Sequence, residues 1–243
     1  MKGIVKLMMK PPRKMQPLSD NELHRLLNFI GYGRLQSAVW FIGMEEGGAG
    51  VDTIRGRLKF KKIEDCADAH RILGIEKFHW GKRRIQSTWR GMCCIMLGLD
   101  GRATTKENIR RYQAESLGRI HGRILLTELM PLPKPGIDHW GYNELIPQYA
   151  SSEEYYNDVK PRRILLLRQL VKKHKPAVII CYGKKYWPNF KTIFSKSSFK
   201  TIGQFEIAKE DGNLIILTHH FAQKTMNGKF DKVVSIIKTH NAK

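Results

Sequence analysis

The chain has 243 residues, 42% of them hydrophobic, and this length and composition suit one substantial core. Lysine and arginine number 43 against 22 acidic residues, so the formal net charge is +21 at pH 7, which indicates a polyanionic partner such as nucleic acid; a basic surface without a ligand is the alternative. No segment approaches the roughly 20 apolar residues of a membrane span, so we expect no membrane partner.

The first residues differ in character from the rest. Residues 1–20 combine three prolines with many basic residues, which predicts a basic N-terminal arm ahead of a single domain over residues 21–243. Lys6 and Lys10 interrupt the apolar run of this arm, so it lacks the core of a signal peptide. We therefore expect a cytoplasmic protein.

The elements that follow are typical of an α/β protein. A helix is expected to begin where Ser19 or Asp20 can cap it. This helix is expected to run through Leu23, Leu26, Leu27 and Ile30. Four short apolar runs have the composition of buried strands, at residues 38–42, 124–126, 178–181 and 214–217. With a helix over residues 161–174 between two of them, they predict a three-layer α/β/α fold with a central, mostly parallel, four-stranded sheet.

Functional groups of such sheets gather past the carboxyl ends of the strands. The four segments there are residues 43–50, 127–133, 182–185 and 218–222, which supply carboxylates, glycines and a histidine pair. The site is expected at this edge of the sheet.

Glu45 and Glu46 lie in a glycine-dense segment that we expect to be a turn. Glycines let a ligand approach closely, so a carboxylate there can orient or deprotonate a water molecule. A solvated loop with two surface acids is the alternative. A phosphate-binding loop is disfavoured, because the lysine of such loops is missing and paired carboxylates repel phosphate.

His219 and His220 end the fourth apolar run, so their rings are expected to face opposite sides. One of them can then donate a hydrogen bond to a developing anion, while the other packs. A purely structural role for both is the alternative.

Glu128 follows the second apolar run and precedes a pair of prolines that would hold it in place. An ionised carboxylate only accepts hydrogen bonds, so it suits an amino group such as N4 of cytosine and repels a carbonyl such as O4 of uracil. A helix cap or a surface ion pair is the alternative.

Residues 78–90 interleave aromatic and cationic side chains, a mixture that can bind phosphates and stack on bases. The alternative is a purely structural role, because half-buried aromatic side chains beside extended lysines produce the same sequence pattern. Within this segment Trp80 is a candidate for base binding, and Lys82, Arg83 and Arg84 are candidates for DNA binding.

The chain has four cysteines, Cys66, Cys93, Cys94 and Cys181, without a Cys-x-x-Cys pair or a matching histidine spacing. They predict reduced, partly buried thiols, and no metal site.

Four segments together resemble the motifs of the uracil-DNA glycosylase superfamily. Residues 41–47 (FIGMEEG) resemble the first motif, a strand followed by a glycine-containing turn, and residues 125–132 (LLTELMPL) are similar to the segment that reads the flipped base. Residues 175–183 (KPAVIICYG) resemble a structural strand of the family, and residues 217–222 (LTHHFA) resemble the segment with the catalytic histidine. The resemblance spans residues 38–238.

The resemblance implies roles for individual residues. Glu45 falls on the residue that positions water, Glu128 on the base-reading asparagine and His220 on the motif histidine. Further base-binding candidates are Met44, Glu46, His219 and Trp80. Further DNA-binding candidates are Lys184 and, on the loop that enters the minor groove, Gln223, Lys224, Met226 as a wedge, and Asn227.

The chain also departs from the motifs. Glu46 stands in place of the first motif's proline, Glu128 in place of the asparagine and Phe221 in place of the proline after the histidine. The iron-sulfur cysteines of some branches are missing. The implied activity is a monofunctional glycosylase that flips out and excises a pyrimidine, uracil or, because of Glu128, a modified cytosine such as those of phage DNA, in repair or antiviral defence.

The resemblance implies a monomer that acts on single- or double-stranded DNA and needs no cofactor. Two other functions remain open at this point. One is a DNA-binding protein of the same fold that has lost catalysis. The other is a nuclease that holds a divalent cation between Glu45, Glu46 and Glu128.

Overall fold

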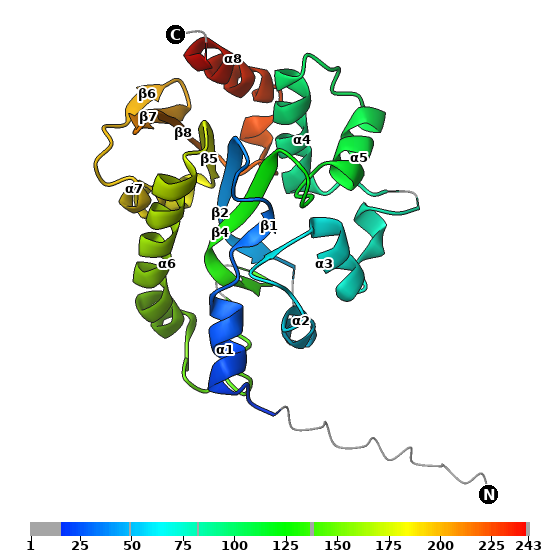
Figure 1. The fold of residues 1–243 in the computed structure, drawn as a ribbon, viewed down its shortest axis with the longest axis vertical. Coiled ribbons are helices and arrows are strands. Elements are labelled where there is room, and N and C mark those ends of the chain that lie inside the picture. The colour runs from blue at the N-terminus through cyan, green and yellow to red at the C-terminus, as the bar shows by residue number, and fades with distance from the viewer. Residues whose placement is uncertain (1–15, 49, 82, 137–138, 242–243) are drawn as a thin grey trace, which may run out of the picture.

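The computed structural model describes residues 16–48, 50–81, 83–136 and 139–241, and Figure 1 shows their arrangement. The predicted arm therefore falls mostly outside the described residues. At its described end, Leu18 is buried and its N–H donates to the carbonyl of Leu145.

The described residues form one sheet of eight strands in the order β3-β1-β4-β2-β5-β8-β7-β6. The strands are β1 (Gly31–Gly33), β2 (Val39–Gly47), β3 (Ile63–Glu64), β4 (Ile124–Lys134), β5 (Val178–Tyr182), β6 (Lys200–Ile202), β7 (Phe205–Glu210) and β8 (Asn213–Thr218). The α/β class is confirmed, and all four predicted strands occur as the parallel block β4-β2-β5-β8.

The predicted limit of four strands is wrong, because antiparallel neighbours extend both sides of the parallel block. β1 pairs antiparallel with β4, and β7 pairs antiparallel with β8. β3 and β6 then add short outer strands. The sheet is therefore mixed.

Helices cover both faces of the sheet, as Figure 1 shows for α6 on one side and α4 and α5 on the other. The helices are α1 (Asp20–Leu27), α2 (Val51–Arg57), α3 (Cys66–Ile72), α4 (Ser87–Leu99), α5 (Lys106–Glu115), α6 (Ser152–His174), α7 (Trp187–Ile193) and α8 (Phe230–Asn241), with short 3-10 turns η1 (Glu76–Phe78), η2 (Lys184–Tyr186) and η3 (Lys224–Met226). In the described part of the chain, no helix combines the length and hydrophobicity needed to cross a bilayer.

The core consists of two clusters, one on each face. Alternate residues of a strand point to opposite faces, so Phe41 packs with α4, α5 and α8, whereas Trp40 and Ile42 pack with α1, α6 and α7. Burial on both faces explains why the central strands are almost continuously apolar.

The two helices expected from the sequence both occur. Ser19 caps α1 and forms a reciprocal capping box with Glu22, although the helix ends at Leu27. α6 begins at Ser152, earlier than predicted, because Ser151 caps it and Pro161 is accommodated inside the helix.

The segment expected to be a turn after residue 42 is instead strand. β2 continues to Gly47, and its pairing with β4 shifts register between Glu45, opposite Met130, and Gly47, opposite Lys134. Two prolines in this stretch of β4, at positions 131 and 133, have no N–H to donate to a regular ladder, which accounts for the shift. Glu45 and Glu46 are thus held by an irregular strand.

Candidate functional site

A cavity of about 660 Å³ opens at the carboxyl ends of the parallel strands. It receives Glu45 and Glu46 from β2, Glu128 from β4 and Tyr182 from the last position of β5. His220, just past β8, also lines it. Segments far apart in the sequence therefore contribute ionisable groups to one cavity.

Glu45 is held by two partners. The Tyr156 hydroxyl donates to its Oε2 at 2.5 Å, and Nζ of the buried Lys134 lies 3.7 Å from its Oε1. Burial raises the pKa of the Glu45 carboxyl, against the opposing effects of Tyr156 and Lys134. A positioned carboxylate with a raised pKa is a stronger base than a surface glutamate.

Glu46 is engaged in a second ion pair. Nη2 of Arg57 lies 2.7 Å from its Oε1, and the Tyr32 hydroxyl donates to its Oε2 at 2.8 Å. Burial raises the pKa of Glu46, but Arg57 and the hydrogen bonds outweigh burial, so the pKa is lowered overall. Glu46 is therefore ionised at neutral pH and compensates the buried charge of Arg57.

Glu128 is in a different electrostatic state. Its Oε1 accepts a hydrogen bond from the Tyr182 hydroxyl at 2.7 Å, while its buried Oε2 has no partner among the described residues. Burial raises the pKa of Glu128 to about 8, and the charges of Glu46 and Glu45 add to this effect. Glu128 is therefore mainly neutral at pH 7, and its free oxygen can carry a proton.

The backbone beside Glu128 leaves room for this carboxyl group. A Cβ atom at Gly43 would lie 2.0 Å from Oε2 of Glu128 and 2.4 Å from Oη of Tyr182. A glycine at position 43 is thus a steric requirement for the pair. Arg163 holds the same stretch of β4 by donating to the carbonyls of Glu128 and Leu129.

The hydrogen bonds of His220 indicate its tautomer. The N–H of Ala222 donates to Nδ1 at 3.3 Å, so Nδ1 is the acceptor and Nε2 carries the ring proton. Burial lowers the pKa of His220, which keeps the ring neutral at pH 7. Its ring lies 5.7 Å from that of Tyr182, between centroids.

Other base-binding candidates lie away from the cavity lining. Met44 is buried in the core cluster with α6 and α7. His219 lies against Trp187 and Thr225, so the two histidines do have different surroundings, as expected. The Arg71 guanidinium lies 4.7 Å from the centre of the Trp80 ring.

The DNA-binding candidates differ in exposure. The exposed ones are Arg84, Lys184, Gln223, Lys224 and Asn227. Arg83 is half-buried and paired with Glu115 at 3.0 Å, and Lys82 lies outside the described residues. Met226 is fully buried in the core, so it is not exposed as a wedge. It anchors the loop after β8 from beneath.

Several site residues were missed by the sequence analysis. Tyr32, Arg57 and Tyr156 act as partners of the carboxylates, and no local pattern marks them because the contacts join distant segments. Phe78 and Trp89, from the aromatic and cationic segment, do line the cavity.

One group of potential metal ligands was also not anticipated. Among the described residues, Cys66, His70 and His79 are the one group of three whose ligand atoms all lie within 4.8 Å of one another. His70 also lines the cavity. Within the described part of the chain, the carboxylates of Glu45, Glu46 and Glu128 do not form such a group.

The sequence matches no protein-family model. It also gives no match among the curated proteins. A functional assignment therefore depends on the geometry of the cavity.

Proposed function

We propose that the protein is a monofunctional DNA glycosylase that flips a pyrimidine nucleotide out of DNA and hydrolyses its glycosidic bond. The observation that carries the proposal is that Glu45 of β2, Glu128 of β4 and His220, just past β8, line one cavity of about 660 Å³. This space is large enough for a flipped base. The fold is consistent with the resemblance to the uracil-DNA glycosylase superfamily, with outer strands added.

Glu45 is the proposed base. Its carboxylate would take a proton from water as the water oxygen bonds to C1′ of the sugar and the bond between C1′ and the base nitrogen breaks. The bonding electrons leave with the base, which becomes an anion. The hydrogen bond from Tyr156 and the charge of Lys134 hold Glu45 in position for this step.

His220 is the proposed partner of the leaving base. A neutral ring with its proton on Nε2 can donate a hydrogen bond to an oxygen on which negative charge develops. A donor fixed in advance stabilises this charge without reorganisation in the transition state.

Glu128 is the proposed reader of the base edge. The ionised form considered from the sequence accepts only, but a neutral carboxyl group has a donor at Oε2 and an acceptor at Oε1. It can donate to O4 of uracil and accept from N3–H, or accept from N4 of a cytosine. Uracil and a modified cytosine are therefore both proposed substrates. The pH dependence of their excision rates distinguishes them.

The test measures base release. Duplexes and single strands with uracil or a modified cytosine are incubated with the protein, released bases are identified by mass spectrometry, and abasic sites are cleaved by hot alkali. We expect a free base and alkali-dependent cleavage. Binding without base release, or strand breaks without alkali, would contradict the proposal in favour of a binding protein or a nuclease.

Variants connect the activity to the cavity. Glu45→Gln and His220→Ala are each expected to lower the single-turnover rate by roughly 100-fold or more. The exposed residues Glu144 and His121 provide matched controls, since Glu144→Gln and His121→Ala remove the same groups at positions that do not line the cavity. Equal losses in all four variants would exclude the assigned roles.

A further inference from the structure

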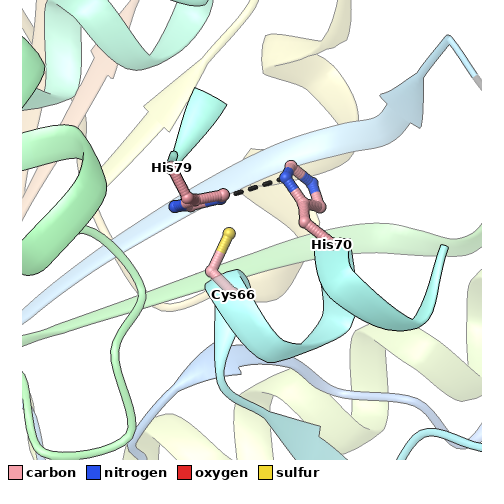
Figure 2. Close-up of side chains that lie close together, drawn as sticks. All are labelled: Cys66, His70 and His79. Carbon is pink, nitrogen blue, oxygen red and sulfur yellow. Dashed lines mark hydrogen bonds between the residues drawn. The ribbon is translucent and has the colours of Figure 1, made fainter. Parts of the chain in front are cut away.

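Figure 2 shows a group of three side chains, Cys66, His70 and His79, that point toward one another. Cys66 and His70 are four residues apart on α3, so they lie on the same face of this helix. His79 comes from the segment directly after η1. Their relative exposures are 0%, 4% and 3%, so solvent does not compete for them.

The distances within this group fit a shared ion. Nε2 of His79 lies 3.0 Å from Nδ1 of His70. Two nitrogens bound to one tetrahedral zinc ion at about 2.05 Å are roughly 3.3 Å apart, so a small movement would admit the ion. All three ligand atoms are mutually within 4.8 Å.

One hydrogen bond joins two members of the group. A single proton is shared between Nε2 of His79 and Nδ1 of His70, so one nitrogen donates and the other accepts. A cation that accepts sulfur and nitrogen donors would instead be bound by both of these nitrogens and by the Cys66 sulfur.

We propose that Cys66, His70 and His79 bind one zinc ion. Thiolate and imidazole are the donors that zinc prefers, and spacings of three and eight intervening residues place them on two short elements. The described chain supplies three ligands, which leaves a further coordination position for water or another ligand.

The ion would connect two elements of the cavity wall. The ring of His70 stacks on Trp89 at 5.2 Å between centroids, and both side chains line the cavity with Phe78 of η1. α3 and η1 are short, with seven and three residues, so a metal crosslink between them would stabilise this wall. The inference is independent of the proposed reaction.

The first test uses the wild-type chain. Protein purified without added chelator is dialysed and its metal content is measured by plasma mass spectrometry, with the expectation of one zinc ion per chain. Replacement of zinc by cobalt is expected to produce the visible bands of a tetrahedral site and a thiolate-to-cobalt charge-transfer band. A chain that stays free of zinc after incubation with equimolar zinc, and shows neither cobalt signal, would overturn the proposal.

Variants then assign the ligands. Cys66→Ser is expected to abolish the charge-transfer band, and His70→Ala and His79→Ala are expected to lower zinc occupancy at least 10-fold. Cys94→Ser is the matched control, because Cys94 is also a buried free thiol but lies on α4 outside the group. Retention of zinc and of the cobalt spectrum in Cys66→Ser would reject the site. Where a variant fails to fold by circular dichroism, the wild-type cobalt spectrum decides.

Discussion

The space that a side chain at Gly43 would occupy is filled by the carboxyl group of Glu128, whose Oε2 lies 2.0 Å from the position of an added Cβ. The two residues lie opposite each other on neighbouring parallel strands. β2 therefore needs a residue without a side chain at position 43, so that the carboxyl group of Glu128 on β4 can occupy this space.

Gly43→Ala is expected to displace Glu128 and Tyr182 and to lower the free energy of unfolding by roughly 1–3 kcal/mol, as overpacking does. Urea denaturation measures this change. Gly136→Ala is the control, because no atom lies within 4 Å of its added Cβ and Gly136 is exposed. Equal stability of the two variants would show that the carboxyl group moves aside at no cost.

Glu128 makes stability depend on pH. Its folded-state pKa of about 8 lies above the ordinary 4.5, so the folded state binds this proton more tightly. Its contribution is fully present below about 4.5 and is lost as the pH rises toward about 8, by at most about 1.4 kcal/mol per pH unit. The difference in unfolding free energy between wild type and Glu128→Gln should shrink across this range. A constant difference would refute the raised pKa.

The same proton should affect base selection. If Glu128 donates to a carbonyl such as O4 of uracil, excision of uracil should fall as the pH rises through about 8. Excision of a modified cytosine, for which Glu128 accepts, should not fall in this way. Single-turnover rates at several pH values on both substrates measure the difference, and Glu128→Gln should make uracil excision independent of this titration.

The ion pair between Glu46 and Arg57 is expected to contribute to stability. The Arg57 side chain is 5% exposed and that of Glu46 is 29% exposed, so Glu46→Gln leaves a buried cation with weaker compensation. We expect a loss of roughly 3 kcal/mol in urea denaturation, at the lower end for buried pairs. Glu107→Gln is the control, since it breaks an exposed pair with Arg111, and should cost under about 0.5 kcal/mol. A similar cost for both would contradict the assignment.

If the protein binds DNA as proposed, binding should weaken steeply with salt, because lysines and arginines that neutralise phosphates release counterions and the chain has a net charge of +21. Fluorescence anisotropy in a salt series gives the slope of log K against log salt. Lys184→Ala and Lys224→Ala, past the carboxyl ends of β5 and β8, are each expected to lower its magnitude by about 0.9. Lys173→Ala, which precedes β5 at the opposite edge of the sheet, should leave it unchanged. An equal effect of all three would indicate diffuse binding.

The sequence was most informative where residues are buried on both faces. The central strands, such as β5, are continuously apolar and could be recognised without structural information. The outer strands could not, because β1 and β3 have three and two residues and every residue of β6 is exposed. Such strands are defined by their pairing rather than by an apolar pattern.

The sequence predicted several of the side chains that line the candidate site, but not their protonation states. Strand ends indicated Glu45, Glu128 and His220. The pKa of Glu128 depends on its burial and on the carboxylates of Glu46 and Glu45 on β2, which the sequence alone does not reveal. Cys66 and His70 have the spacing of a helical ligand pair and could have been noticed, whereas the approach of His79 required the fold.

The buried position of Met226 has a consequence for the loop that follows β8. Its side chain is inaccessible, while Gln223, directly before η3, and Lys224 and Thr225 on η3 are exposed. The buried Met226 side chain therefore fixes the turn to the core and preorganises it. A partner that contacts it meets a rigid surface, and little conformational entropy is lost in the encounter.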